Sequence, residues 1–351
     1  MPLKMPYQLR DYQDKLITRV FDSWGSGNRR LVLQLATGAG KTIIFSAIAR
    51  EFLRRGLGVL VLAHRLELIT QAHEKLEAVS GLPAGIIKAG FPLHPDYDIQ
   101  VASIQSLARR KRFPEAGLVV IDEAHHSSAR TYTNILEAYP QAFILGVTAT
   151  PARIDGQGFK FIYDDLICGP SVSLLIEQGY LCRFKLFAAA ARIRLKRGIR
   201  TTAGDYNQQD LSEAIDTSLL MGDLIATWYK YAQGKRTVVF TVDIKHSQQI
   251  ATAYNQAGIR AEHLDGDTNE TERKAILERF RAGETLILSN CGLVGEGLDV
   301  PAIEAVQCVR PTKSLVKQVA TDWASAAPIT GKRTRYLDRS HRKLEISRLA
   351  G

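Results

Sequence analysis

The sequence predicts an α/β protein made of two domains with parallel sheets, and three observations lead to this prediction. The 351 residues are enough for two domains that each bury a core. Short, continuous apolar runs alternate with stretches of helical periodicity, the pattern of parallel strands that helices cover on both faces. This alternation occurs twice, so we expect one domain at 1–168, a connector at 169–218 and a second domain at 219–351.

The composition is that of a soluble globular protein with a surplus of positive charge. Hydrophobic residues make up 45% and charged residues 23% of the chain. No apolar run approaches a membrane span and the N-terminus lacks a signal-peptide core, so we expect no membrane partner. The four scattered cysteines form no C-x-x-C pair, which favours the reducing cytoplasm. A net charge of +10 favours a polyanionic partner, and a basic surface that serves only solubility is the alternative.

The first domain is expected to begin with a helix from Leu9 toward Trp24, because its apolar residues recur at helical spacing. An apolar strand follows from Leu31, then a glycine-bearing turn and a helical pattern that starts at Ile43. This order of strand, glycine loop and helix is the context that a phosphate-binding loop requires. The stretch Leu31–Thr42 therefore predicts a site for nucleotide phosphates.

Four residues of this loop have the chemistry of phosphate binding. Gly38 and Gly40 let the backbone adopt left-handed angles and bring its N–H groups close to phosphate oxygens. Lys41 can reach the β and γ phosphates, and Thr42 can place its hydroxyl on Mg²⁺. The usual pattern begins with glycine, where this chain has Leu35. An ordinary glycine-rich turn between a strand and a helix is the alternative.

An acidic pair follows a buried strand of the first domain. Asp122 and Glu123 come directly after the run 118–121, and the carboxyl ends of strands face the ligand crevice in open α/β sheets. Asp122 can hold Mg²⁺ through water, and Glu123 can polarise an attacking water; a solvated strand end is the alternative.

Other elements of this domain are predicted as strands at 58–62, 99–101 and 143–147 and a helix at 66–79.

A second α/β pattern begins near residue 219. Its helices are predicted at 219–231, 244–256 and 270–280, and its strands at 237–240, 286–289 and 305–309. Residues 263–268 are predicted to form a turn. In the connector, 184–195 has the pattern of a strand and 205–207 that of a loop, and the basic run 192–200 fits a solvated edge strand better than a nucleic-acid contact.

Several stretches resemble the motifs of one helicase family. Motifs I, II and III of the superfamily 2 helicases of the DEAH-box type resemble Ala36–Thr42, Asp122–His125 and Thr148–Thr150. The glutamine motif and motifs Ia and Ib of that superfamily are similar to Leu9–Gln13, Ala63–Arg65 and Ser103–Leu107. Motifs IV and V resemble Phe240-Thr241 and 295–301. Within the superfamily, the sequence is similar to the RadD-like bacterial and phage proteins.

The resemblance implies two RecA-like domains of the P-loop NTPase fold, the second incomplete at its C-terminal end. It also implies ATP and Mg²⁺ as cofactors, ATP-dependent helicase activity and a nucleic-acid partner, DNA in preference to RNA. ATP binding would involve Arg10, Gln13, Thr37, Gly38, Ala39, Gly40, Lys41, Thr42, Gly297 and Asp299. Mg²⁺ would bind at Thr42 and Asp122, and catalysis would involve Lys41, Asp122 and Glu123. Nucleic acid would contact His64, Arg65, Ser103, Gln105 and Thr241, and nucleotide state would be coupled to domain movement through His125, Thr148 and Thr150.

The end of the chain departs from this family pattern. After motif V the family continues to motif VI, Gln-x-x-Gly-Arg-x-x-Arg, whose arginines reach the γ-phosphate, but no Gly-Arg pair follows Lys317 here. Read one nucleotide later, with synonymous codons chosen freely, residues 320–328 become Gln-Gln-Ile-Gly-Arg-Ala-Leu-Arg-Pro. Read in the same frame, 332–344 become Asn-Gly-Arg-Ala-Ile-Trp-Ile-Asp-His-Thr-Gly-Asn-Trp. We therefore predict that residues 318–351 are a frameshifted tail.

Two alternatives to an active helicase remain. One is another class of P-loop NTPase, such as a nucleotide kinase, although the motif III stretch and the second α/β half argue against it. The other is a protein that binds ATP and DNA but hydrolyses little ATP because the motif VI arginines are absent. Steady-state ATPase rates with and without single-stranded DNA distinguish these possibilities.

Overall fold

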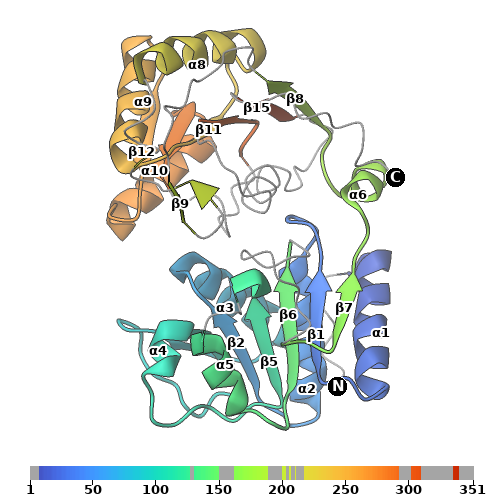
Figure 1. Cartoon of the computed structure of the whole chain (residues 1–351). Coiled ribbons are helices and arrows are strands. Elements are labelled where there is room, and N and C mark those ends of the chain that lie inside the picture. Colours follow the sequence, from blue (N-terminus) through green and yellow to red (C-terminus); the bar gives the residue numbers. More distant parts are fainter. Residues whose placement is uncertain are drawn as a thin grey trace. The chain divides into compact units, whose positions relative to one another are not determined.

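The computed structural model describes residues 8–126, 130–149, 162–188, 200–202, 205–206, 210, 217–291, 302–309 and 335–339 (Figure 1). The chain divides into two compact units, Met1–Glu177 and Gln178–Gly351. Each unit contains a parallel sheet with helices packed against it, which confirms the predicted α/β class with parallel sheets. Among the described residues, no helix is both long and apolar enough to cross a membrane.

The first unit is built on a seven-stranded sheet in the order β3-β4-β2-β5-β6-β1-β7, with every neighbouring pair parallel. The strands are β1 (Arg30–Gln34), β2 (Val59–Ala63), β3 (Ala84–Ile87), β4 (Ile99–Ser103), β5 (Leu118–Asp122), β6 (Phe143–Thr148) and β7 (Asp165–Cys168). The five interior strands match the predicted ones. The edge strands β3 and β7 were not predicted, because the glycine in β3 and the aspartate that begins β7 interrupt their short apolar runs.

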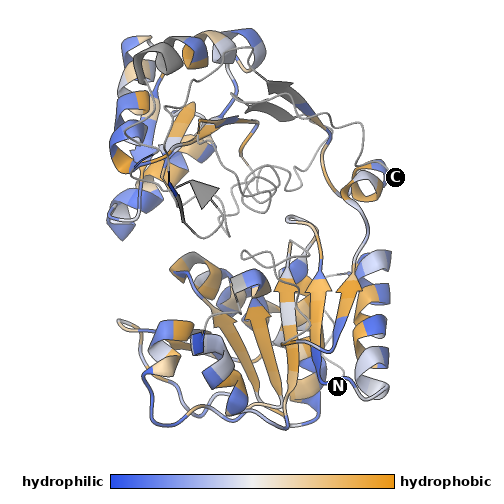
Figure 2. Ribbon diagram, in the orientation of Figure 1, coloured by the Kyte–Doolittle hydropathy of each residue, from blue (hydrophilic) through white to orange (hydrophobic). Residues whose placement is uncertain are grey.

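Helices cover both faces of this sheet (Figure 1). The flanking helices are α1 (Asp11–Gly25), α2 (Lys41–Arg54), α3 (Leu66–Ser80), α4 (Ile104–Ala108) and α5 (Arg130–Glu137). Val119 and Ile121 of β5 lie in one buried cluster with residues of α5. Because successive strand residues point to opposite faces, Val120 points away from that cluster, and it is also fully buried. The strands are therefore apolar at almost every position, as their colour in Figure 2 shows.

The second unit has a six-stranded parallel sheet in the order β12-β13-β11-β14-β15-β8. Its elements are β8 (Phe184–Ala188), α8 (Thr217–Tyr231), β11 (Thr237–Phe240), α9 (Ile244–Gln256), β12 (Ala261–Leu264), α10 (Glu270–Ala282), β13 (Ile287–Asn290), β14 (Ala305–Cys308) and β15 (Arg335–Arg339). Val239 packs with residues of α8 and α9, whereas the adjacent Val238 packs with residues of α10. Helices therefore cover both faces of this sheet as well.

Smaller elements differ from the local predictions at two places. The remaining short elements are η1 (Ala124–His126), α6 (Val172–Glu177), β9 (Thr201–Thr202) and β10 (Asp205–Tyr206). β10 pairs antiparallel with β9, where a loop was predicted. β12 includes His263, which pairs with Ser289, so the turn begins only after Leu264. Because two of the four residues of β12 are polar, its sequence has no clear strand pattern. Its pairing with β13 defines it as a strand. Residues 189–195 of the predicted connector strand lie outside the described residues.

Candidate nucleotide-binding site

The predicted phosphate loop lies between β1 and α2. Gly38 has φ of 78° and Gly40 has φ of 87°, both in the left-handed region that favours glycine. Gly40 is also the residue that caps the N-terminus of α2. A Cβ atom at this position would collide with the side-chain amide nitrogen of Gln13. The backbone angle therefore requires glycine at the entry to α2, and a side chain there would also displace the Gln13 amide.

The N-terminal helix α1 holds the phosphate loop through one carbonyl group. The Tyr12 hydroxyl donates a hydrogen bond of 2.6 Å to the carbonyl oxygen of Ala39, and the Gln13 amide donates one of 3.2 Å to the same oxygen. The Arg10 guanidinium donates to the Tyr12 hydroxyl at 3.0 Å. Arg10 and Gln13 were predicted to bind ATP, but Tyr12 was not. Its place beside Gln13 was visible in the sequence, but its partner 27 residues away was not.

Removing the Tyr12 hydroxyl should weaken nucleotide binding without unfolding the chain. In Tyr12→Phe, the Ala39 carbonyl keeps only the longer bond from Gln13, and a lost buried hydrogen bond costs about 1–2 kcal/mol. We expect ATP affinity to fall about fivefold to thirtyfold. The measurement is a titration with a fluorescent ATP analogue. Tyr229→Phe, which removes an exposed hydroxyl bonded to the Ala257 carbonyl, is the matched control. Equal affinities in both variants would contradict a positioning role for Tyr12.

The acidic pair lies at the carboxyl end of β5 and faces the phosphate loop. The Lys41 Nζ is 3.6 Å from Glu123 Oε1, and each side chain is 11% exposed. Asp122 Oδ1 accepts a hydrogen bond of 3.0 Å from the Glu123 backbone N–H. Glu123 has φ of 54°, an uncommon conformation for a residue other than glycine, and such strain clusters at functional sites. The structure thus brings Lys41, Asp122 and Glu123 together.

The electrostatics of this pair suit a divalent cation. Burial and the charge of Glu123 raise the pKa of Asp122 to about 6, although the charges of Lys41 and His64 act in the opposite direction. Two buried carboxylates therefore lie side by side next to Lys41. Mg²⁺ prefers oxygen ligands and takes one or two carboxylates together with phosphate oxygens. Asp122 and Thr42, the second residue of α2, offer such oxygens, so the residues present fit Mg²⁺.

A histidine connects the acidic pair to the neighbouring strand. The His125 Nδ1 atom is 3.3 Å from Glu123 Oε2 and 3.2 Å from the hydroxyl of Thr148, which is fully buried at the end of β6. The backbone N–H of Leu35 in turn donates to the Thr148 carbonyl at 2.9 Å. His125 therefore contacts both Glu123 and the end of β6, and Leu35, which directly follows β1, bonds to the same strand end. Thr150, the third predicted coupling residue, lies outside the described residues.

The residues predicted to contact nucleic acid lie at strand ends. His64 and Arg65 follow β2, and Arg65 caps α3. Ser103 ends β4, and its hydroxyl donates to the Gln105 amide oxygen at 2.9 Å. In the second unit, Thr241 follows β11 and is buried, with its hydroxyl donating to the Asn290 carbonyl at 2.9 Å. The predicted ATP-binding residues Gly297 and Asp299 lie outside the described residues.

Two family models match the chain in consecutive segments. The model described as "Type III restriction enzyme, res subunit" matches residues 6–153, and the model described as "Helicase conserved C-terminal domain" matches residues 219–342. The first segment contains Lys41, Asp122 and Glu123, and the second contains the six-stranded sheet except for β8. The two sheets therefore correspond to the two halves of a helicase.

Curated relatives and solved structures agree with these matches. IRC3 of Saccharomyces cerevisiae, which carries the name ATP-dependent helicase, is 32% identical over 87% of this chain and 47% of its own length. A 51.5 kDa protein of a Lactococcus phage is 33% identical over 81% of this chain and 60% of its own length. The structure of the Type ISP restriction-modification enzyme LlaBIII bound to DNA superposes with a TM-score of 0.71 at 19% identity, covering 96% of this chain and 28% of that one.

This chain spans about half to three fifths of the length of these two curated relatives. The structural likeness, at 19% identity, supports the fold of two RecA-like domains. The sequence matches cover both units and include the phosphate loop, the acidic pair and the second sheet. Both units of this chain are therefore similar to the superfamily 2 helicases.

Proposed function

We propose that this chain is an ATP- and Mg²⁺-dependent nucleic-acid translocase or helicase that acts on DNA in preference to RNA. The observation that carries the proposal is the buried cluster of Lys41, Asp122 and Glu123 at the junction of phosphate loop and β5. A cation and two carboxylates at the N-terminus of a helix are the groups that phosphoryl transfer to water requires. Hydrolysis would be coupled to closure and reopening of the two domains.

Each residue of the cluster has a separate role in this proposal. Lys41 and the backbone N–H groups at the start of α2 bind the phosphates of ATP. Asp122 and Thr42 would hold Mg²⁺, which neutralises charge on the phosphate oxygens. Glu123 accepts a hydrogen bond from the attacking water and orients it. His125, in contact with both Glu123 and Thr148, carries the change in the site to the end of β6.

The variant Glu123→Gln tests the catalytic part of this proposal. An amide cannot act as a base, so we expect ATP hydrolysis to fall by about 10²–10⁴-fold while ATP binding persists. The measurements are phosphate release and an ATP titration on the same preparation. Glu137→Gln, at the exposed end of α5, is the matched control. If the two variants hydrolyse ATP at the same rate, Glu123 does not activate water.

The preference for DNA rests on relatives alone, because positive charge attracts the phosphates of DNA and RNA alike. The chain has a net charge of +10, and the LlaBIII structure that it resembles is described as bound to DNA. If the predicted contacts bind phosphates, the logarithm of affinity for single-stranded DNA should fall with the logarithm of salt concentration by about 0.7 per contact. Fluorescence anisotropy at several salt concentrations measures this slope.

One contact can be removed to calibrate that slope. Arg65→Ala should lower affinity for all DNA sequences alike and reduce the slope by about 0.7. Arg54→Ala, on the exposed end of α2 where Arg54 pairs with Glu51, is the control and should leave the slope unchanged. An affinity that does not change with salt would mean that the positive charge serves only solubility. Parallel titrations with RNA of the same sequence test the preference for DNA.

A second candidate is an ATP- and DNA-binding protein with little hydrolysis. The absence of a Gly-Arg pair after Lys317 supports this alternative, because the family uses arginines there to stabilise the transition state. ATP binding without DNA-stimulated hydrolysis in the chain as given would favour this candidate. Hydrolysis that single-stranded DNA stimulates would favour the first.

A further inference from the structure

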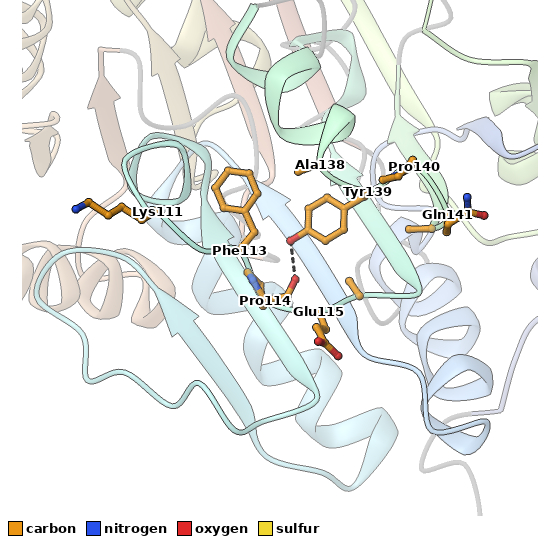
Figure 3. A pocket seen from close by; sticks show the side chains of 10 residues that line it. Lys111, Phe113, Pro114, Glu115, Ala138, Tyr139, Pro140 and Gln141 are labelled. Atoms are coloured by element: carbon orange, nitrogen blue, oxygen red, sulfur yellow. Dashed lines mark hydrogen bonds between the residues drawn. The ribbon is translucent and has the colours of Figure 1, made fainter.

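A pocket opens at the end of the first sheet opposite to the acidic pair. Its walls are the loop that enters β5 and the loop that enters β6, and its volume is about 550 Å³. Figure 3 shows that its lining comes from Phe113–Ala116 on one side and Ala138–Ala142 on the other. Asp122 lies at the far end of β5, and a strand of this length spans about 16 Å. The pocket is therefore separate from the nucleotide-binding site.

The pocket has an apolar and fixed wall. The rings of Phe113 and Tyr139 stack with their centroids 6.2 Å apart and 12° between their planes. The Tyr139 hydroxyl donates a hydrogen bond of 2.8 Å to the Pro114 carbonyl (Figure 3), and only 8% of the residue is exposed. Since that hydroxyl already has a partner, the wall offers hydrophobic contact. Pro140 and Ala138 extend the apolar lining.

Four consecutive cations lead into this pocket. Arg109, Arg110, Lys111 and Arg112 immediately precede Phe113, and all except Arg110 are exposed. Within the described part of the chain, none of the four lies within ion-pair distance of a carboxylate, and Lys111 also lines the pocket. Unpaired cations beside a largely apolar cavity, whose lining also includes the carboxylate of Glu115 and the amide of Gln141, form a composite surface, which we call the basic pocket.

We propose that the basic pocket binds an acidic peptide segment of a partner protein. The cations pair with its carboxylates, and one bulky apolar side chain enters the cavity against the half-buried Phe113 and the exposed Pro140. Clusters of arginines recognise acidic motifs, and an apolar anchor in a pocket commonly dominates such interfaces. A nucleic acid is a poorer occupant. The Tyr139 ring is buried and stacks on Phe113, so a base cannot stack on Tyr139.

The test uses the full chain and a fluorescein-labelled peptide in which a run of glutamates precedes a leucine–phenylalanine pair. Two matched peptides replace the apolar pair by serines or the glutamates by glutamines. We expect the first peptide to bind and each matched peptide to bind at least about tenfold more weakly. The double variant Arg109→Glu/Lys111→Glu, which reverses two exposed cations, should weaken binding of the first peptide by a similar factor.

A second variant fills the cavity without touching the core. Ala138 is exposed at the rim, so Ala138→Trp should fold and should weaken peptide binding at least about tenfold by occupying the pocket. Lys15→Glu, an exposed cation of α1, is the charge control and should bind the peptide like the parent. ATP hydrolysis should be the same in all three variants as in the parent chain.

Three results would overturn the proposal. One is failure of the parent chain to bind the first peptide more tightly than the two matched peptides. Another is binding that neither Arg109→Glu/Lys111→Glu nor Ala138→Trp weakens, since the peptide would then occupy another surface. The third is displacement of the peptide by labelled oligothymidylate together with loss of oligonucleotide binding in both variants, which would identify the basic pocket as a nucleic-acid surface.

Discussion

Restoring the shifted reading frame after Lys317 should raise ATP turnover by about 10³–10⁵-fold, the contribution of arginines that reach the γ-phosphate. This corresponds to about 4–7 kcal/mol of transition-state stabilisation. The shifted reading supplies Gly-Arg-Ala-Leu-Arg at 323–327, where the chain as given has Trp-Ala-Ser-Ala-Ala. Binding of ATP should change much less, because the first unit holds the phosphate loop.

The second sheet gives an independent reason to expect a more apolar sequence at β15 than the chain as given has. β15 lies between β14 and β8 and pairs in parallel with both. Interior strands of parallel sheets are usually apolar along their whole length, but β15 reads Arg-Tyr-Leu-Asp-Arg, with three charged residues in five. The shifted reading of the same five positions is Ala-Ile-Trp-Ile-Asp. An apolar strand with an acidic residue at its carboxyl end suits this place in the sheet.

Sequencing the gene and comparing two expressed chains tests the predicted frameshift after Lys317. ATP hydrolysis is measured with and without single-stranded DNA for the chain as given and for the frame-restored chain. The matched control is the restored chain with both arginines of the new motif replaced by alanine, which should return turnover to the original level. A restored chain that is no faster, or a gene in which no frame encodes the motif, would refute the prediction.

Replacing Lys41 by alanine should lower ATP affinity by about 10²–10⁴-fold. The ammonium group makes charge-assisted hydrogen bonds to two phosphates, each worth about 1.5–3 kcal/mol. The fold should persist, because Lys41 is the first residue of α2 and its side chain is not part of the hydrophobic core. Losing its charge should also raise the pKa of Asp122 further, since Lys41 lowers it in the parent chain.

Calorimetric titration with ATP measures this loss. Lys15→Ala, an exposed lysine of α1, is the matched control and should bind ATP like the parent. Circular dichroism of both variants checks that each is folded. Unchanged ATP affinity in Lys41→Ala would mean that the loop 35–42 is not the phosphate site.

The sequence alone was sufficient for the architecture and for placing the phosphate loop and the acidic pair at strand ends, and the reason is local. The interior strands of the first sheet are continuous apolar runs because helices bury them on both faces, so β2, β5 and β6 could be recognised without knowledge of their neighbours. The loop before α2 and the pair Asp122-Glu123 each follow such a strand directly, and therefore both were visible as short motifs.

Other features depend on residues that meet only in the folded chain. The hydrogen bond between Tyr12 and the Ala39 carbonyl joins α1 to the phosphate loop. The left-handed backbone of Glu123 lies directly after the last residue of β5. The basic pocket requires Phe113 and Tyr139 to stack across two loops. Sequence periodicity reports which face of an element is buried, but not which partner buries it. Hydrogen-bond partners, edge strands and cavities were therefore set by packing between distant segments.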